Sequence, residues 1–170
     1  MKKICLIALS YLILSFATKD QDSPYAFIKY FNECVNIYQA PTGREVTGCI
    51  FQDSINETNY YEVRLLEKSS LRFKVWMQAY ETVEPIVGWI DKECIAVHPD
   101  ILDDNQGYYV VLYNSPDKFP RKVYLKDKFD EVLTVVDYDG QWLKVVFAVN
   151  TKLHEGWVKD FCPNIYNSCN

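Results

Sequence analysis

The residues best suited to chemistry in this 170-residue chain are its six cysteines and two histidines. No two cysteines form a C-x-x-C pair, so the ligand spacing of a structural zinc site is missing. A catalytic thiolate needs an imidazole beside it. However, His98 stands in a polar connecting segment, and His154 stands in an insertion before Gly156. We therefore expect no metal, no cofactor and no enzyme activity.

The N-terminus has the pattern of a secretory signal peptide. Lys2 and Lys3 precede an apolar run over residues 4–16. Ser15 and Ala17 are the small residues of a cleavage site. The run is too short to cross a bilayer, and no later stretch is apolar enough to do so. We expect an exported protein of the periplasm or cell surface, with no membrane span in the mature chain.

Export permits disulfide bonds among the cysteines that remain after cleavage. These are Cys34, Cys49, Cys94, Cys162 and Cys169. An odd number leaves at least one thiol free or paired between chains. Several connectivities stay open at this point, and so does the alternative of buried free thiols.

The charge balance narrows the choice of partner. Without Lys2 and Lys3 the chain has 16 basic and 23 acidic residues, a net charge of −7. The sequence shows no basic patch that would neutralise phosphates. We therefore expect neither nucleic acid nor an anionic membrane surface as the partner.

Alternating hydrophobicity predicts β-strands along most of the chain. In residues 71–76 and 142–147 the apolar side chains recur with a period of two, as in half-buried antiparallel strands. Residues 131–136 form a more apolar strand that leads to Asp139-Gly140, a strong hairpin signal. Short strands joined by tight turns predict an all-β fold.

The chain also contains an internal repeat. Gly88-Trp89 and Gly156-Trp157 lie 68 residues apart, and a cysteine follows each tryptophan after five residues. Upstream, residues 35–41 match residues 110–116. Two copies of one small unit are therefore expected instead of one large core. The expected boundaries are a signal peptide 1–17, a leader 18–30 that is an extra strand or helical turn, a first domain 31–98, a linker 99–106 and a second domain 107–170 with a C-terminal tail.

In its order of motifs, the repeat resembles bacterial SH3-like domains in tandem. The second half of that family reads as a hairpin, then Trp-x-Lys-Val, then Gly-Trp-Val. The second copy has Trp142, Lys144-Val145 and Gly156-Trp157-Val158 in that order. The resemblance covers residues 31–98 and 107–165, and it implies two tandem small SH3-like barrels.

The resemblance also implies roles for the aromatic residues. The two Gly-Trp tryptophans, Trp89 and Trp157, are expected to fill the barrel cores. Trp142 is expected to point away from the core, either as an exposed groove residue or packed against the first copy. In the first copy Arg72 stands in its place, so the second copy is expected to carry the ligand. The expected ligand-binding residues are Tyr113, Trp142, Phe161 and Tyr38.

The opening and closing strands of SH3-like barrels lie side by side, so the resemblance implies that Cys34 lies near Cys94, close enough for a disulfide between them. Cys162 would then bond to Cys169 or stay free.

The resemblance points to a non-catalytic binding or scaffolding protein whose partner is a cell-wall peptide or another envelope component. The alternative is a protein–protein interaction module, such as an envelope inhibitor or an immunity-type protein. Asp53-Ser54-Ile55 and Asn56-Glu57-Thr58 are candidate glycosylation sequences in one exposed loop. The sequence specifies neither the ligand nor the oligomeric state.

Overall fold

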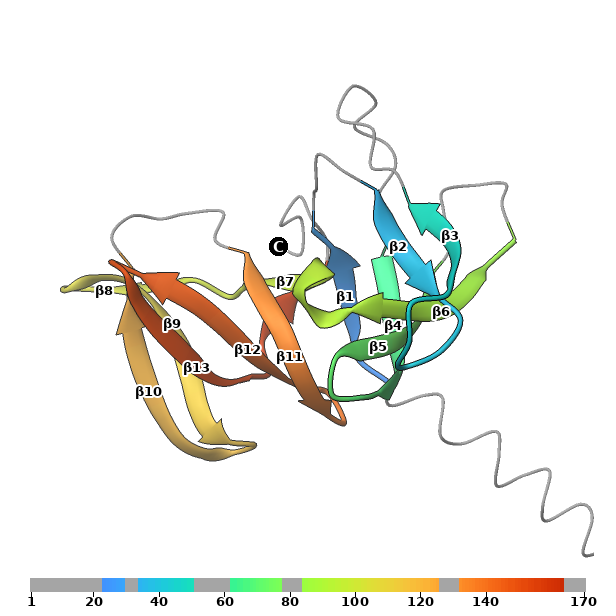
Figure 1. Ribbon diagram of the computed structural model, residues 1–170. Coiled ribbons are helices and arrows are strands. Elements are labelled where there is room, and N and C mark those ends of the chain that lie inside the picture. The colour runs from blue at the N-terminus through green and yellow to red at the C-terminus, as the bar shows by residue number, and fades with distance from the viewer. Residues whose placement is uncertain (1–22, 30–33, 51–61, 78–83, 126–131, 164–170) are drawn as a thin grey trace, which may run out of the picture.

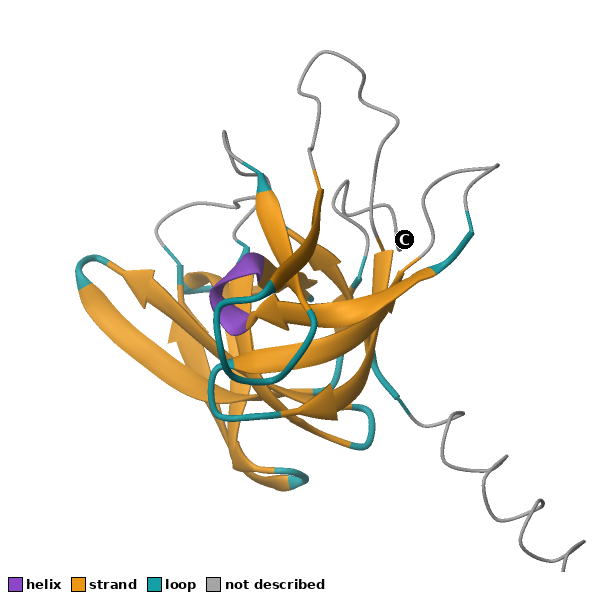
Figure 2. Cartoon of the chain, turned by 45° about the vertical axis from the view of Figure 1, so that its right-hand side comes forward, coloured by secondary structure: helices purple, strands orange, loops and turns teal. Residues whose placement is uncertain are grey.

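The computed structural model describes residues 23–29, 34–50, 62–77, 84–125 and 132–163. The predicted signal peptide, the candidate glycosylation sequences at 53–58 and Cys169 lie outside these residues. Within them the fold is all-β, as predicted, and the only helix is one 3-10 turn, η1 (Lys92–Cys94) (Figure 2). No helix in the described ranges is long and apolar enough to cross a bilayer.

The described strands form one antiparallel sheet. In chain order they are β1 (Tyr25–Ile28), β2 (Val35–Tyr38), β3 (Val46–Ile50), β4 (Glu62–Lys68), β5 (Arg72–Met77), β6 (Ile86–Asp91), β7 (Ile95–Pro99), β8 (Leu102–Asp104), β9 (Gly107–Ser115), β10 (Lys118–Tyr124), β11 (Leu133–Asp139), β12 (Trp142–Val149), β13 (Lys152–Val158) and β14 (Phe161–Cys162). Their order in the sheet is β10-β9-β13-β12-β11-β7-β1-β4-β5-β6-β2-β3, with β8 beside β9 and β14 beside β7. The sheet ends at β10 and β3 and is not closed, so the two separate barrels of the prediction are not confirmed.

The two copies seen in the sequence have the same strand pairing. We call β2–β6 repeat one and β9–β13 repeat two; they lie side by side with β1 and β7 between them (Figure 1). Val75 lies opposite Gly88 in repeat one, and Val145 lies opposite Gly156 in repeat two. A bulge interrupts β4 and β11 at the same place. The sequence repeat is therefore a structural repeat with a matching register.

Strand β7 joins the two repeats. Its residue Ala96 pairs with Phe27 of β1 on one side and with Thr134 of β11 on the other. All five residues of β7 are buried, and this explains why 95–97 is a continuous apolar run instead of an alternating one. The leader predicted at 18–30 thus contains the strand β1, and the segment predicted as a linker at 99–106 contains β8, which pairs with β9.

Polar and aromatic contacts reinforce the junction between the repeats. The Lys68 ammonium, in β4, lies 2.7 Å from the Asp137 carboxylate of β11 and also donates to the Tyr138 carbonyl. The Phe73 ring lies 5.8 Å, centroid to centroid, from the Tyr138 ring. Because these contacts add to the shared strand, the two repeats are held in one relative orientation.

The disulfide of repeat one corrects the predicted pairing. Cys34 bonds to Cys49, with their Cα atoms 5.7 Å apart, and Cys94 is free. The predicted Cys34–Cys94 bond is wrong because β2 pairs along its length with β3 and meets β6 only where Tyr38 lies opposite Trp89. Cys162 is also in a disulfide.

Repeat two closes the matching hairpin without a disulfide. The pairing of β9 with β10 follows that of β2 with β3 over its first three residue pairs. Tyr109 and Lys122 therefore occupy the places of Cys34 and Cys49. The Lys122 ammonium lies 4.1 Å from the centroid of the Tyr109 ring and forms an ion pair with Asp104. A cation–π contact thus stands where the first hairpin has a covalent bond.

Because the two hairpins match, the double variant Tyr109→Cys/Lys122→Cys should form a disulfide on oxidation. Closing this loop should raise the free energy of unfolding by about 2–4 kcal/mol relative to the reduced protein. Peptide mapping without reduction and urea unfolding would measure both effects. Tyr109→Ser/Lys122→Ser is the control that removes the cation–π contact without adding a bond. Two thiols that stay unpaired under oxidising conditions would show that the hairpins differ in geometry.

The Lys68–Asp137 pair should make stability depend on pH. Burial raises the pKa of Asp137, but hydrogen bonds from Lys68 and from the Tyr138 N–H outweigh it, so this pKa lies below its ordinary value of 3.8. A lowered folded-state pKa means that the stabilisation is present above about pH 4 and is lost as the pH falls through the folded pKa. Asp137→Asn should therefore destabilise the protein at pH 7 by roughly 0.5–1 kcal/mol, because the pair is partly exposed.

Thermal melts from neutral to acid pH would test this. The difference between the parent and Asp137→Asn should shrink as the pH falls below about 4, and it should disappear once the pH is well below the folded-state pKa of Asp137. Glu67→Gln, which breaks the Lys74–Glu67 pair within repeat one, is the control that leaves the junction intact. A difference that persists at acid pH would contradict the assignment.

Candidate functional site

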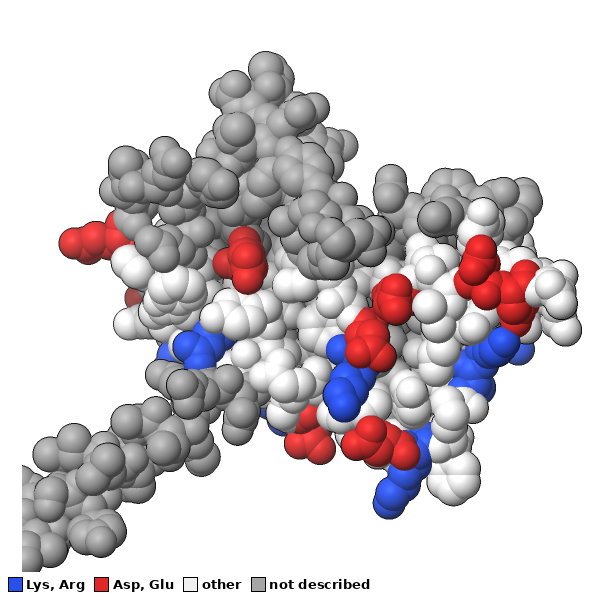
Figure 3. All heavy atoms as spheres, turned by 180° about the vertical axis from the view of Figure 1, so that it is seen from behind, with Lys and Arg blue, Asp and Glu red and all other residues white. Residues whose placement is uncertain are grey.

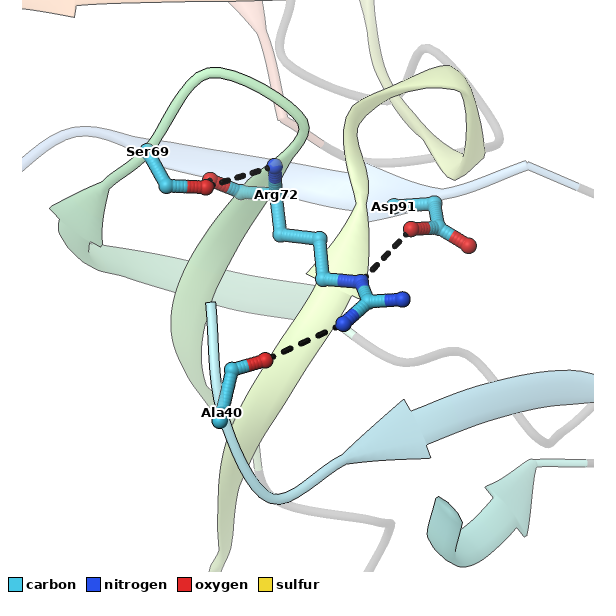
Figure 4. Close-up of polar contacts among 4 residues, drawn as sticks. All are labelled: Ala40, Ser69, Arg72 and Asp91. Atoms are coloured by element: carbon cyan, nitrogen blue, oxygen red, sulfur yellow. Dashed lines mark hydrogen bonds and ion pairs between the residues drawn. The ribbon is translucent and has the colours of Figure 1, made fainter. Parts of the chain in front are cut away.

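On the face of the sheet opposite the core, which we call the outer face, repeat one packs Arg72 onto Tyr38. The guanidinium carbon lies 3.3 Å from the Tyr38 ring centroid. Nε donates to the Asp91 carboxylate at 2.8 Å, and Nη1 donates to the Ala40 carbonyl at 3.1 Å (Figure 4). The side chain is only 8% exposed. Arg72 is therefore a buried cation with two of its three guanidinium nitrogens hydrogen-bonded.

Repeat two builds the same place from different side chains. Trp142 occupies the position of Arg72, and its ring meets the Tyr113 ring edge-on at 5.0 Å between centroids and 78° between planes. The Lys159 ammonium lies 5.7 Å from the centroid of Trp142. Stacking and edge contacts of this kind stabilise aromatic pairs beyond their buried area. A tyrosine ring is thus covered by a large side chain in both repeats.

The structure brings together two of the four predicted ligand-binding residues. Tyr113 and Trp142 are in contact, but Trp142 is 9% exposed and is not the exposed anchor that the sequence predicted. Tyr38 lies at the equivalent place in repeat one. Phe161 lies on β14, half-buried and packed against the core. Among the described residues, neither Tyr38 nor Phe161 contacts the Tyr113–Trp142 pair.

The prediction that the Gly-Trp tryptophans are buried in the core holds in part: Trp89 is buried, with 8% exposed, whereas Trp157 is half-buried, and neither ring belongs to the core cluster. In β6, Gly88 and Ile90 face Val75 and Phe73 of the core, so Trp89 between them points to the outer face. It is the glycine that the core requires. A Cβ on Gly88 would lie 2.3 Å from an Ile37 side-chain carbon.

The same close approach occurs in repeat two. A Cβ on Gly156 would lie 2.9 Å from the Leu112 Cβ and 3.1 Å from the Tyr113 carbonyl oxygen. Trp157, the next residue, is half-buried on the outer face. The Gly-Trp pair therefore marks the point where one strand crosses closely over another.

Sequence reasoning missed two residues of this outer face, Trp157 and Lys159. Trp157 lies directly opposite Tyr113, where β13 meets β9. Lys159 lies in the bend that follows β13, and its ammonium reaches the Trp142 ring on the same side. Alternation along β13 gives a signal for Trp157 once the side of the strand that faces the core is known, whereas Lys159 lies beyond the strand and has no such signal.

Two residues that could do covalent chemistry, Cys94 and His98, lie partly or fully inside the protein. Burial raises the pKa of the Cys94 thiol to about 11, and the nearby Glu93 and Asp91 carboxylates add to this effect. The thiol is therefore protonated at neutral pH, whereas a nucleophilic cysteine needs a thiolate. His98 is buried and stacks on Phe27, with ring centroids 5.0 Å apart.

Comparisons with known proteins found no matching family model, no matching curated protein and no matching solved structure.

Since Arg72 and Trp142 are buried to the same degree, both should contribute to stability. Trp142→Ala should lower the free energy of unfolding by about 2–4 kcal/mol, because it uncovers Tyr113 and leaves a void. Arg72→Ala should lower it by roughly 1–3 kcal/mol, because the Ala40 carbonyl and Asp91 lose their donor. Urea unfolding would measure both changes. Lys74→Ala, which removes a partly exposed ion pair on the same strand, should cost below about 1 kcal/mol. Stability unchanged in Trp142→Ala would mean that the indole is not packed as described.

Proposed function

We propose that this protein is an exported, non-catalytic binding or scaffolding protein that contacts its partner through the outer face of repeat two. The partner is a cell-wall peptide or another envelope component. The observation that carries the proposal is the set of aromatic side chains that repeat two presents on the side opposite its core. They are Tyr109, Tyr113, Trp142 and Trp157.

Aromatic side chains on an outer face have two explanations, internal packing and partner contact. Tyr109, Tyr113 and Trp157 are only half-buried in the free protein, so part of each ring remains available. Rings of this kind offer apolar area with a polar tip at low entropic cost, and they are enriched where proteins bind partners. Trp142, which is covered, would support Tyr113 and present its edge.

The junction supports a scaffolding role. The shared strand β7 and the Lys68–Asp137 pair fix the repeats relative to each other, so a partner meets one preformed surface. On the side shown in Figure 3, acidic and basic side chains are interspersed and neither sign dominates.

We also propose that each repeat, together with its neighbouring strands, is an SH3-like unit. The orders β7-β1-β4-β5-β6 and β14-β7-β11-β12-β13 match strand for strand. In this interpretation β7 closes the first unit and opens the second. The resemblance stated from the sequence is the basis for this assignment, and the matching strand orders support it.

The alternative, an inhibitor or immunity-type protein, is favoured by Phe119. This residue is 73% exposed near the turn between β9 and β10, with a backbone φ of 54° that is uncommon for a bulky residue. An aromatic ring held outward at some backbone cost suits insertion into a pocket of a partner protein.

Co-sedimentation of the purified exported protein with cell-wall sacculi tests the proposal. Trp157→Ala should reduce the bound fraction strongly, whereas Trp89→Ala, the matched change in repeat one, should leave it nearly unchanged. The two tryptophans occupy equivalent places, but Trp89 is buried and Trp157 is half-buried. Thermal melts of both variants therefore check that each is folded at the assay temperature, so that the difference in the bound fraction reports binding. Absence of sedimentation, together with an envelope protein cross-linked through Phe119, would favour the alternative. Equal binding by both variants would move the contact away from repeat two.

A further inference from the structure

One neighbouring pair of positions on the outer face carries different chemistry in the two repeats. In repeat one, Arg72 lies opposite Asp91 on the neighbouring strand. In repeat two, Leu143 lies opposite Val158, as Phe73 lies opposite Ile90 in repeat one. Trp142 precedes Leu143 and Lys159 follows Val158, so these two residues correspond to Arg72 and Asp91. A cation beside an anion in one repeat corresponds to an aromatic ring beside a cation in the other.

In repeat one the charge is neutralised within the protein. Asp91 accepts from the Arg72 guanidinium, which also donates to the Ala40 carbonyl and stacks on Tyr38 (Figure 4). With two of its nitrogens bonded and one face covered, Arg72 has little capacity left for a ligand.

In repeat two no described residue neutralises the Lys159 cation. Lys159 is exposed, and no carboxylate of the described residues lies within ion-pair distance of it. The nearby Glu155 is already paired with Lys144. Asp139 lies opposite Trp142 on the strand away from Lys159 and forms no ion pair with it. An uncompensated ammonium beside an aromatic pair is a place where an anionic group gains a partner and displaces no internal one.

We propose that the corner formed by Tyr113, Trp142 and Lys159 binds a carboxylate that is carried next to an apolar group, as at the C-terminal residue of a peptide. The carboxylate accepts from the Lys159 ammonium, and the apolar group lies against the half-buried Tyr113 ring and the small part of Trp142 that remains exposed. Repeat one does not bind it, because Asp91 already supplies the carboxylate from within the chain. This inference rests on the proposed binding function and names the chemical group that is recognised.

An NMR titration with N-acetyl-phenylalanine tests the proposal, with N-acetyl-phenylalaninamide as the uncharged match. The four tryptophans give four indole N–H signals, and the Trp142 signal should shift saturably with the acid. The amide should bind about tenfold more weakly, since it lacks one charge-assisted hydrogen bond. Lys159→Gln should reduce the affinity for the acid to that for the amide. Equal affinity for acid and amide, or full affinity in Lys159→Gln, would overturn the proposal.

The repeats provide matched exchange variants. Trp142→Arg/Lys159→Asp gives repeat two the side chains that already pack in repeat one, so it should stay folded and lose the titration. Arg72→Trp/Asp91→Lys is the reverse exchange, and it should add a second site and raise the stoichiometry from one to two. Circular dichroism checks folding. If Arg72→Trp/Asp91→Lys does not fold, the proposal is judged on Trp142→Arg/Lys159→Asp alone. A folded variant that still binds the acid would then overturn it.

The outcome is separable from the general binding proposal. Sacculi that bind the parent and Lys159→Gln equally would leave the proposed function standing and remove the carboxylate site. Saturable binding of the acid, lost in Lys159→Gln, would establish the site even if sacculi fail to bind, and the partner would then be a carboxylate-bearing group of another envelope molecule.

Discussion

The pairing of β7 with β1 on one side and β11 on the other is the constraint on which the rest of the structure depends. A strand that is buried along its whole length has no water to satisfy its backbone groups, so neighbouring strands must supply the hydrogen bonds. Ile95, Ala96 and Val97 are completely buried there. The central strand therefore belongs to both repeats, and the core continues from one repeat into the other.

This continuity fixes where variation is tolerated. Core positions such as Val75 and Val145, opposite the crossing glycines, keep the same size and chemistry in the two repeats. On the outer face the scaffold instead allows exchange, because a side chain there needs only to cover a tyrosine. Arg72 and Trp142 satisfy that need to almost the same degree, with 7% and 9% of each residue exposed. One scaffold thus presents a neutralised ion pair on one repeat and an aromatic–cation pair on the other.

Much of the local structure could be predicted from the sequence, since it depends on neighbours in the chain. Alternation located β5 and β12 within a residue or two. The Asp139-Gly140 signal located the hairpin between β11 and β12, where Gly140 has the positive φ, 54°, that such turns use. The candidate site was predicted in part. The Tyr113–Trp142 contact follows from the repeat, whereas Trp157 depends on knowing which side of β13 faces the core, and Lys159 lies beyond that strand.

The sequence by itself determined the all-β class, the two matching copies and the residues that share a face of each strand, because a period of two and a repeat are properties of order along the chain. The tertiary structure alone decided which face is covered, which cysteine bonds to Cys34 and which strand both repeats use. Each of these depends on contacts between segments far apart in sequence. Ile37 crossing over Gly88 turns Trp89 outward, and the β2–β3 pairing brings Cys34 to Cys49. The order of residues shows which side chains share a face of a strand. Only the packing of a distant strand determines which of the two faces is buried.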